Sequence, residues 1–402
     1  MILLRSLGVL NPIKVARQIG HGLGTARDTA AEAGVSAFRI TIEQALLYFR
    51  NNLSRCEYYM YGLYRPELSW EEKTAFIADR DSRRYWEVLT PFKYATGFKN
   101  KLLFHRLCQG AALPVPRFYG LFDRVSGRAA SGAPLKTGTD IARLMENAEL
   151  SDLVVKPVEG SKGLSVLPLR IEEGRFVAMS GRVFTPDELA QYLTSEDTLK
   201  KTYPGQGEPP RGFIFQERLR NHPGMTDLVG ETLLSIRFTT FLDLRGNVEI
   251  LTGILKLPGR DCGVDNLSQG ALAVHVDLET GALGEGRFYQ RAPSRSFRAH
   301  PESGVRFFRW KLPLWKEACE LALRAAAAFP MVHVLGWDIA ITPDGPVIIG
   351  ATSSWAPDFA QLTTRRGLMQ GRFKETYLAL RARHNGNGFS GSGSKPDPET
   401  LS

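Results

Sequence analysis

A lysine followed by a glycine-bearing polar loop is the segment whose residue types point most directly to chemistry. Lys156 ends an apolar run that starts at Leu153, and the loop Glu159–Gly163 has the sequence Glu-Gly-Ser-Lys-Gly. A lysine supplies a point charge for a phosphate oxygen, and glycines let backbone N–H groups approach such oxygens. The segment suits phosphate binding, and an ordinary β-hairpin whose glycines only satisfy turn geometry explains it equally well.

Lys101 is a second candidate for contact with a phosphate. It begins the amphipathic segment 101–109, which we expect to be a helix that ends at Gly110, before the Pro114-Val-Pro116 break. One basic residue at a helix start is usually a solvated side chain. Lys101 therefore indicates phosphate binding only in combination with other candidate residues.

Three further positions place polar side chains on or after apolar strands. Gln216–Leu219 follows a buried strand, and strand ends are where clefts place the donors and acceptors that could recognise an adenine edge. Arg237 and Lys256 lie on successive strands dominated by Ile, Leu, Phe and Thr, where a charge is costly to bury without a partner. A strand emerging into solvent and an ordinary salt bridge are the simpler interpretations.

Asp338 is the one carboxylate in the apolar sequence Trp-Asp-Ile-Ala-Ile. Hard cations such as Mg²⁺ take oxygen ligands beside phosphates, so Asp338 is a candidate metal ligand. A capped or salt-bridged structural aspartate is the alternative.

The elements that must position these residues follow from local patterns. Strands are expected at 152–157, 164–169 and 212–217, with hairpins at 235–257, 272 onward and 336–352. Ser69 and Thr185 open capping boxes, so one helix is expected to carry Phe76 and Ile77 and another to start near 186; a further helix is expected over 314–329.

Composition bounds the remaining possibilities. The chain has 402 residues, 43% hydrophobic, and carries 51 Lys+Arg against 42 Asp+Glu, a net charge of +9. A wholly disordered chain, a collagen-like repeat and a disulfide-dense miniprotein are excluded, and an anionic partner is indicated. The four scattered cysteines and the lack of a long apolar run favour a cytoplasmic protein without a membrane span.

The clearest basic stretch lies within 291–316, where arginines and lysines alternate with aromatic residues. Such a stretch could contact single-stranded nucleic acid or an acidic polysaccharide, and solvated arginines are the preferred interpretation. There is no Walker A loop, dinucleotide fingerprint or zinc spacing.

Taken in chain order, these pieces resemble the ATP-grasp superfamily, and most closely its sugar-transfer associated branch, which is similar to α-L-glutamate ligases. The resemblance runs from about Arg55 to Leu368. It is carried by Glu57-Tyr-Tyr, Asn100-Lys101, Val155-Lys-Pro157 with its loop, Gln216–Leu219, Ser235-Ile-Arg237, Val264-Asp-Asn266 with Gly270, His300-Pro301, Leu312-Pro-Leu-Trp315 and Gly336-Trp-Asp338-Ile-Ala.

The resemblance implies an α+β fold in which two subdomains grip ATP between antiparallel sheets. It implies an N-terminal helical extension over 1–90, an ATP-grasp domain over 91–383, divided at 150/151 and 255/256, and a disordered tail over 384–402. ATP and Mg²⁺ are the implied cofactors. The implied ATP contacts are Lys101, Lys156, Glu159, Gly160, Ser161, Gly163, Gln216, Glu217, Arg218 and Leu219. Arg237 and Lys256 are the implied catalytic residues and would face the γ-phosphate or the acyl phosphate, and Asp338 would bind the metal.

The implied reaction is ATP-dependent ligation of a carboxylate to an amine through an acyl phosphate, with a small molecule or an acidic sugar as substrate, in polysaccharide or sugar-conjugate biosynthesis. One departure matters. Such ligases ordinarily end their last hairpin in Glu-x-Asn, both metal ligands, where this chain has Gly350-Ala-Thr352. A three-residue loop at 343–345 would pair Asp338 with position 350, so the missing carboxylate belongs to the metal site. The alternative is therefore a pseudoenzyme that binds nucleotide or a partner without turnover.

Overall fold

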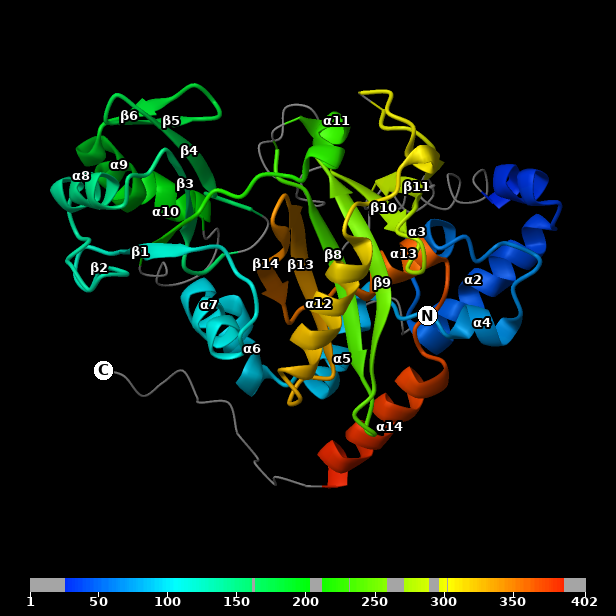
Figure 1. Cartoon of the computed structure of the whole chain (residues 1–402). Helices are drawn as coiled ribbons and strands as arrows, with labels where there is room; N and C mark the ends of the chain where they lie inside the picture. The colour runs from blue at the N-terminus through cyan, green and yellow to red at the C-terminus, as the bar shows by residue number, and fades with distance from the viewer. Residues whose placement is uncertain are drawn as a thin grey trace, which may run out of the picture.

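Two antiparallel sheets form the framework of the molecule (Figure 1). The computed structural model describes residues 26–160, 163–202, 212–230, 232–258, 271–288, 296–301 and 303–386. Each sheet has seven strands, in the orders β2-β1-β7-β3-β4-β5-β6 and β12-β11-β10-β9-β8-β13-β14. Helices accompany both, so the expected α+β class is confirmed.

The N-terminal part is helical, as expected. Residues 26–33 are helical, and α2 (Ala37–Asn51), α3 (Arg55–Met60), α4 (Trp70–Thr74), η1 (Asp79–Asp81) and α5 (Ser82–Leu89) follow. The capping box at Ser69 is present, but α4 ends at Thr74, so the expectation that Phe76 and Ile77 lie in this helix is wrong. Both are buried beyond the helix end. Tertiary packing, not helical periodicity, explains why these positions are apolar.

The first sheet is built from β1 (Phe118–Phe122), β2 (Arg128–Ala129), β3 (Asp152–Pro157), β4 (Leu167–Glu172), β5 (Arg175–Ala178), β6 (Val183–Phe184) and β7 (Phe213–Gln216). Helices α8 (Gly138–Asn147), α9 (Pro186–Thr194) and α10 (Glu196–Thr202) accompany it. The capping box at Thr185 opens α9 with Pro at its start, as predicted. Residues of α8, α9 and the strands share one apolar core.

After η2 (Pro223–Met225) and α11 (Thr226–Val229), the second sheet is formed by β8 (Ser235–Leu242), β9 (Val248–Leu257), β10 (Leu272–Val276), β11 (Leu283–Phe288), β12 (Ser296–Phe297), β13 (Val334–Thr342) and β14 (Gly345–Thr352). The three predicted hairpins are confirmed. The division expected at 255/256 falls inside β9, which pairs with neighbours on both sides; the two sheets are separated instead by residues 217–234.

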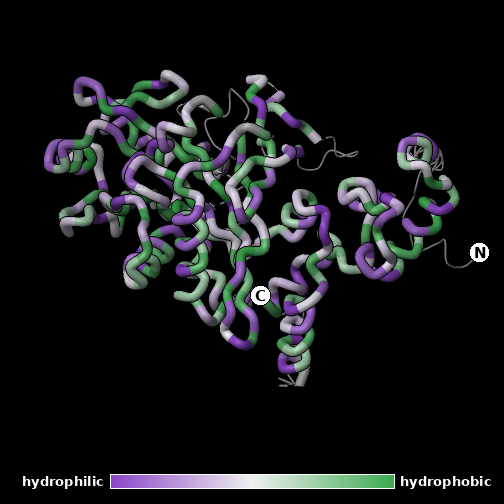
Figure 2. Tube along the Cα trace, turned by 45° about the vertical axis from the view of Figure 1, so that its right-hand side comes forward, coloured by the Kyte–Doolittle hydropathy of each residue, from purple (hydrophilic) through white to green (hydrophobic). Residues whose placement is uncertain are grey.

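The second sheet has helices on both faces. One face packs on η4 (Phe307–Arg309) and α12 (Trp315–Ala327), together with α6 (Phe92–Lys99) and α7 (Lys101–Gly110), in the largest apolar cluster. On the other face, Phe359 of α13 (Pro357–Thr364) packs against Ile254 and Ala273. Figure 2 shows the hydrophobic stretches mainly along the central strands and the hydrophilic ones mainly in peripheral loops and helices.

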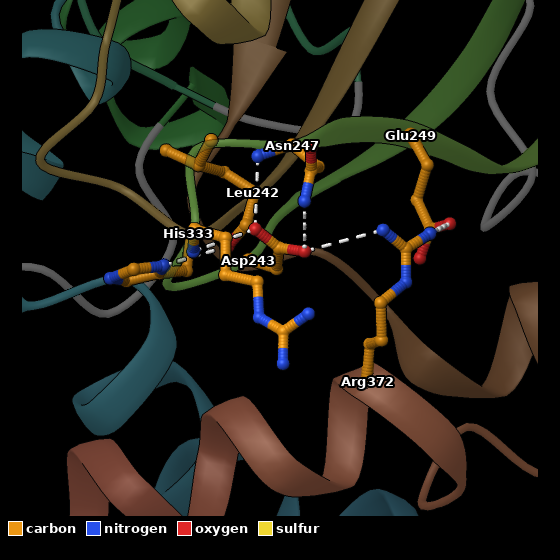
Figure 3. A network of polar contacts seen from close by, with 7 residues as sticks. Leu242, Asp243, Asn247, Glu249, His333 and Arg372 are labelled. Atoms are coloured by element: carbon orange, nitrogen blue, oxygen red, sulfur yellow. Dashed lines mark hydrogen bonds and ion pairs between the residues drawn. The ribbon is translucent and has the colours of Figure 1, made fainter.

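A polar network ties the last helix, α14 (Gly371–Gly386), to the β8–β9 hairpin (Figure 3). The Asp243 carboxylate accepts hydrogen bonds from the backbone of Arg245 and from the backbone and side chain of Asn247. Arg372 of α14 reaches Asp243 at 3.2 Å and also pairs with Glu249. The helix α14 extends to Gly386, past the tail boundary expected at 383/384.

No described helix is both long and apolar enough to span a membrane. Among the described cysteines, Cys56, Cys108 and Cys319 are free thiols, and Cys262 lies outside the described residues.

Candidate functional site

The start of α7 is fastened to the end of β3, and this brings the two predicted lysines into one region. Asn100 caps α7 by accepting from the Leu103 backbone N–H, and its amide donates to the Glu159 carboxylate at 3.1 Å. The Lys101 backbone N–H donates to the Val158 carbonyl at 2.7 Å. The Lys101 ammonium donates to the Gly160 carbonyl at 3.2 Å. Sequence reasoning treated these positions separately; the structure makes them one cluster.

Electrostatics in this cluster favour an anion. Burial, and then the positive charge of Lys156, lower the pKa of Lys101 to about 8, against a smaller opposing effect of Glu159. Two ammonium groups held close enough to perturb one another gain free energy when a phosphate lies between them. The positive charge of Lys156 is therefore close enough to Lys101 to affect it.

The loop after β3 has the backbone that its glycines were expected to provide. Gly160 has φ 130° and Gly163 has φ 66°, conformations that a side chain would strain. The loop joins β3 to β4, which pair antiparallel, so the hairpin interpretation is also correct. Ser161 lies outside the described residues.

The predicted adenine-binding residues lie at the end of β7. Gln216 is buried, and its side-chain amide lies 3.4 Å from Nδ1 of His105 on α7. The Glu217 carboxylate accepts from the Arg117 backbone N–H at 3.0 Å, so it is engaged by the neighbouring chain segment. Arg218 and Leu219 are half-buried beyond it.

His105 is a site residue that sequence reasoning did not assign. Its ring lies on Phe118, with centroids 5.3 Å apart, and its Nε2 is buried without a hydrogen-bond partner in the described part of the chain. Burial, then the charges of Arg106 and Lys156, lower the pKa of His105. The single signal in the sequence is a histidine on the buried side of an amphipathic helix, which a core histidine produces equally well.

Arg237, Lys256 and Asp338 form a charged triad on the second sheet. The Arg237 guanidinium binds both carboxylate oxygens of Asp338, at 2.7 and 2.9 Å, and Lys256 Nζ lies 3.0 Å from one of them. Burial raises the pKa of Asp338, but Arg237 and Lys256 together outweigh it and keep the pKa well below its usual range. The predicted catalytic and metal residues are thus adjacent.

Gly336 makes room for this pairing. A Cβ at position 336 would lie 3.0 Å from Cδ of Arg237 and 2.9 Å from Cγ2 of Thr352. Because glycine has no Cβ, the Arg237 side chain can cross the strand there to reach Asp338.

Position 350 lies opposite Asp338, as predicted, but for a different reason. The turn has two residues, because Thr342 pairs with Gly345, so the expected three-residue loop is wrong. A bulge between Asp338 and Ile339 then shifts the register by one and restores the pairing of Asp338 with Gly350. A Cβ at 350 would lie 3.8 Å from the Asp338 carboxylate.

The residues around Asp338 do not fit a magnesium ion as they stand. Both carboxylate oxygens accept from cationic side chains, and Gly350 offers no ligand. In the described ranges there is no group of three or more His, Cys, Asp or Glu that could hold a metal.

A model of the sugar-transfer associated ATP-grasp family matches residues 80–376. No curated protein matches the chain. Solved structures give distant likenesses. A biotin carboxylase complex from Campylobacter jejuni is 10% identical, with TM-score 0.42, and the match covers 71% of this chain and 46% of that one. An L-amino acid ligase from Bacillus licheniformis is 12% identical, with TM-score 0.37, covering 71% and 48%. D-alanyl-alanine synthetase A from Vibrio cholerae O1 is 10% identical, with TM-score 0.39, covering 73% and 66%. This chain therefore spans between about half and two thirds of these proteins.

Proposed function

This chain belongs to the sugar-transfer associated ATP-grasp family, and from that premise we propose that it is an ATP-dependent ligase that joins a carboxylate to an amine. The observation that carries the proposal is the pair Lys101 and Lys156 beside the Gly160 loop, where the charge of Lys156 lowers the pKa of Lys101 and a bound phosphate would relieve that repulsion. The buried Nε2 of His105 is one further polar atom in the same region that a ligand could satisfy.

The proposed reaction has two steps. A carboxylate oxygen of the substrate attacks the γ-phosphorus of ATP, the bond from that phosphorus to the β-phosphate oxygen breaks, and ADP leaves. The amine then attacks the carbonyl carbon of the acyl phosphate and displaces inorganic phosphate, losing a proton. Charge neutralisation and positioning supply most of the catalysis in such phosphoryl transfers.

Each cluster has a distinct part in this proposal. The phosphates are surrounded by the lysine cluster and its loop, which comprise Lys101, Lys156, Glu159, Gly160 and Gly163. The adenine is lined by the end of β7 and the residues after it, Gln216, Glu217, Arg218 and Leu219. Because the Glu217 backbone N–H donates to the Arg117 carbonyl and one carboxylate oxygen accepts from the Arg117 backbone N–H, the adenine contacts at this position come from the Glu217 carbonyl oxygen or the other carboxylate oxygen. Arg237 and Lys256, already oriented by Asp338, neutralise the phosphate that is transferred.

The described residues around Asp338 do not fit Mg²⁺, because both carboxylate oxygens accept from Arg237 or Lys256. In its place, the triad carries a net charge of +1, from two cations and one carboxylate, on the face of the sheet that presents Asp338. We infer that nucleotide binding at this site depends little on a divalent ion.

The proposed substrate is a small molecule with a carboxylate, and an acidic sugar or an amino acid is the class that the family's name favours. The proposal places the reaction in the cytoplasm, where ATP is available, and within polysaccharide or sugar-conjugate biosynthesis.

A second candidate function is nucleotide binding without turnover. The observation that favours it is the pairing of Gly350 with Asp338. The resemblance implies that positions 350 and 352 also supply metal ligands, and here they are glycine and threonine, so Asp338 is the one carboxylate of the implied set that remains. In this case the Arg237–Asp338–Lys256 contacts are a structural substitute for the metal.

ADP release in the presence of amino acids and uronic acids tests the two candidates. A working ligase releases ADP with at least one substrate, Lys156→Ala abolishes the release, and Lys374→Ala on the distant helix α14 preserves it. If only the double variant Gly350→Glu/Thr352→Asn released ADP, the working ligase would be refuted and the nucleotide-binding protein supported.

A further inference from the structure

A cavity opens where β12 separates from β11. The two strands pair only at Gly286 with Phe297 and at Arg287 with Ser296. After β12 the chain moves away from β11, and Ala299 forms an isolated antiparallel β-bridge with Arg306 just before η4. The space between β11 and this segment has a volume of about 600 Å³, which is the size of an ordinary small-molecule site.

The lining combines cationic, aromatic and acidic groups. Arg298 and Arg306 lie on one wall with Phe308, and Glu285 lies on the β11 wall. Phe308 is 62% exposed, so its ring offers an apolar surface to the cavity. Among the described residues that line the cavity, Glu285 is the single acidic one.

Positive charge exceeds negative charge around Glu285. Its carboxylate lies 3.3 Å from Arg287, 3.8 Å from Arg298 and 3.7 Å from Arg365. Among the described residues that line the cavity, Arg298 and Arg306 carry two positive charges against the one negative charge of Glu285, so the cavity favours a ligand with an anionic group.

The cavity lies beside the proposed ligase site. Arg287 pairs with Ala273, and Ala273 pairs with Lys256, so the three residues lie in one row across neighbouring strands. Directly paired residues point to the same face of a sheet, and two strand spacings separate Lys256 from Arg287 by about 10 Å. Lys256, which pairs with Asp338, and Arg287, which pairs with Glu285 at the cavity, therefore lie on the same face of the sheet.

We propose that this cavity binds an acidic saccharide through its carboxylate, as a binding subsite beside the proposed ligase site and not as the place where that carboxylate reacts. Arginines bind carboxylates with two parallel hydrogen bonds, Glu285 accepts from sugar hydroxyls, and Phe308 packs on the apolar face of the ring. A single-stranded nucleic acid is disfavoured because the cavity has the volume of a small-molecule site.

Ligand-observed NMR titration of the full chain with glucuronate, and with glucose as the neutral match, tests the subsite. Glucuronate binds the wild-type chain and glucose binds more weakly. Arg306→Ala lowers the glucuronate affinity by about tenfold, the loss of one charge-assisted contact. Phe308→Ala lowers the affinity for both sugars. Lys316→Ala removes an exposed cation of the same basic stretch, outside the cavity, and leaves both affinities unchanged.

Binding of a fluorescent ATP analogue in the same samples separates this inference from the proposed function. If ATP binds and glucuronate does not, the subsite is refuted and the ligase proposal is untouched. If glucuronate binds through Arg306 and ATP does not bind, the subsite stands and the ligase proposal fails. Equal affinity for glucuronate and glucose, or an Arg306-dependent affinity for a single-stranded oligonucleotide in place of glucuronate, overturns the inference.

Discussion

Gly350→Glu is the substitution that probes the charge balance at Asp338 most directly. A Cβ at position 350 meets only Asp338, at 3.8 Å, and the φ of Gly350 lies outside the left-handed region. The backbone and the surrounding space therefore accept a side chain there. The new carboxylate lies beside the triad and reduces its net charge from +1 to 0.

The size of the effect follows from the distances in the triad. A phosphate that contacts Arg237 or Lys256 lies about 7 Å from a carboxylate at 350. Coulomb's law with an effective dielectric constant of about 20 gives a repulsion of about 2 kcal/mol for one phosphate charge at that distance, which is roughly 30-fold in affinity when a single charge dominates the effect.

The assay is the affinity for a fluorescent ATP analogue, measured in EDTA and in excess Mg²⁺. The wild-type chain binds with similar affinity in both. Gly350→Glu weakens binding in EDTA by roughly 30-fold, and Mg²⁺ restores it, because two carboxylates can now share a cation. Gly350→Gln has the same shape without the charge, and it retains the wild-type affinity in both conditions.

One result would refute this reasoning. If the wild-type chain itself loses about tenfold or more of its ATP affinity when Mg²⁺ is removed, Asp338 must release Arg237 to bind the metal. The triad would then be a resting arrangement and not a substitute for the metal.

Three further predictions address the other clusters. ATP affinity falls as the pH rises through about 8, where Lys101 loses its proton. Lys156→Met raises the pH at the midpoint of this fall, because it removes a positive charge that lowers the pKa of Lys101. Fluorescence titration with an ATP analogue at a series of pH values measures the midpoint. Hydrogen bonds within its loop lower the pKa of Asp243 to about 2. The contribution of Asp243 to stability is therefore present above the ordinary carboxyl pKa and is lost as the pH falls through about 2. Urea unfolding at a series of pH values shows a smaller loss of unfolding free energy in acid for Asp243→Asn, and the same pH dependence as wild type contradicts the assignment. Gly336→Ala places a methyl group 3.0 Å from Arg237 and lowers the free energy of unfolding by about 1–3 kcal/mol, whereas unchanged stability would show that this space is not needed.

Local patterns in the sequence were sufficient for most of the elements. Alternation and turn residues located the three hairpins of the second sheet, and a capping box located the start of α9. These signals succeed because a hairpin or a helix start is decided by residues within a few positions of one another. The capping box at Ser69 also located α4, but not its end, because the burial of Phe76 depends on distant residues.

The pairing of Asp338 with Gly350 shows where local reasoning reached its limit. The loop length was wrong by one residue, and the bulge after Asp338 compensated for it. Bulges leave no dependable mark in a single sequence, because they are set by how the neighbouring strands twist and pack.

The sequence by itself determined which residues carry charge on apolar strands, and that the last hairpin has Gly350 where a metal-binding carboxylate was expected. Only the tertiary structure decided that Arg237 and Lys256 share Asp338, that Lys101 reaches the Gly160 loop, and that Arg287 extends the same row toward a cavity. These contacts join residues far apart in the chain, and they depend on strand order and on the docking of α7, which no local pattern specifies.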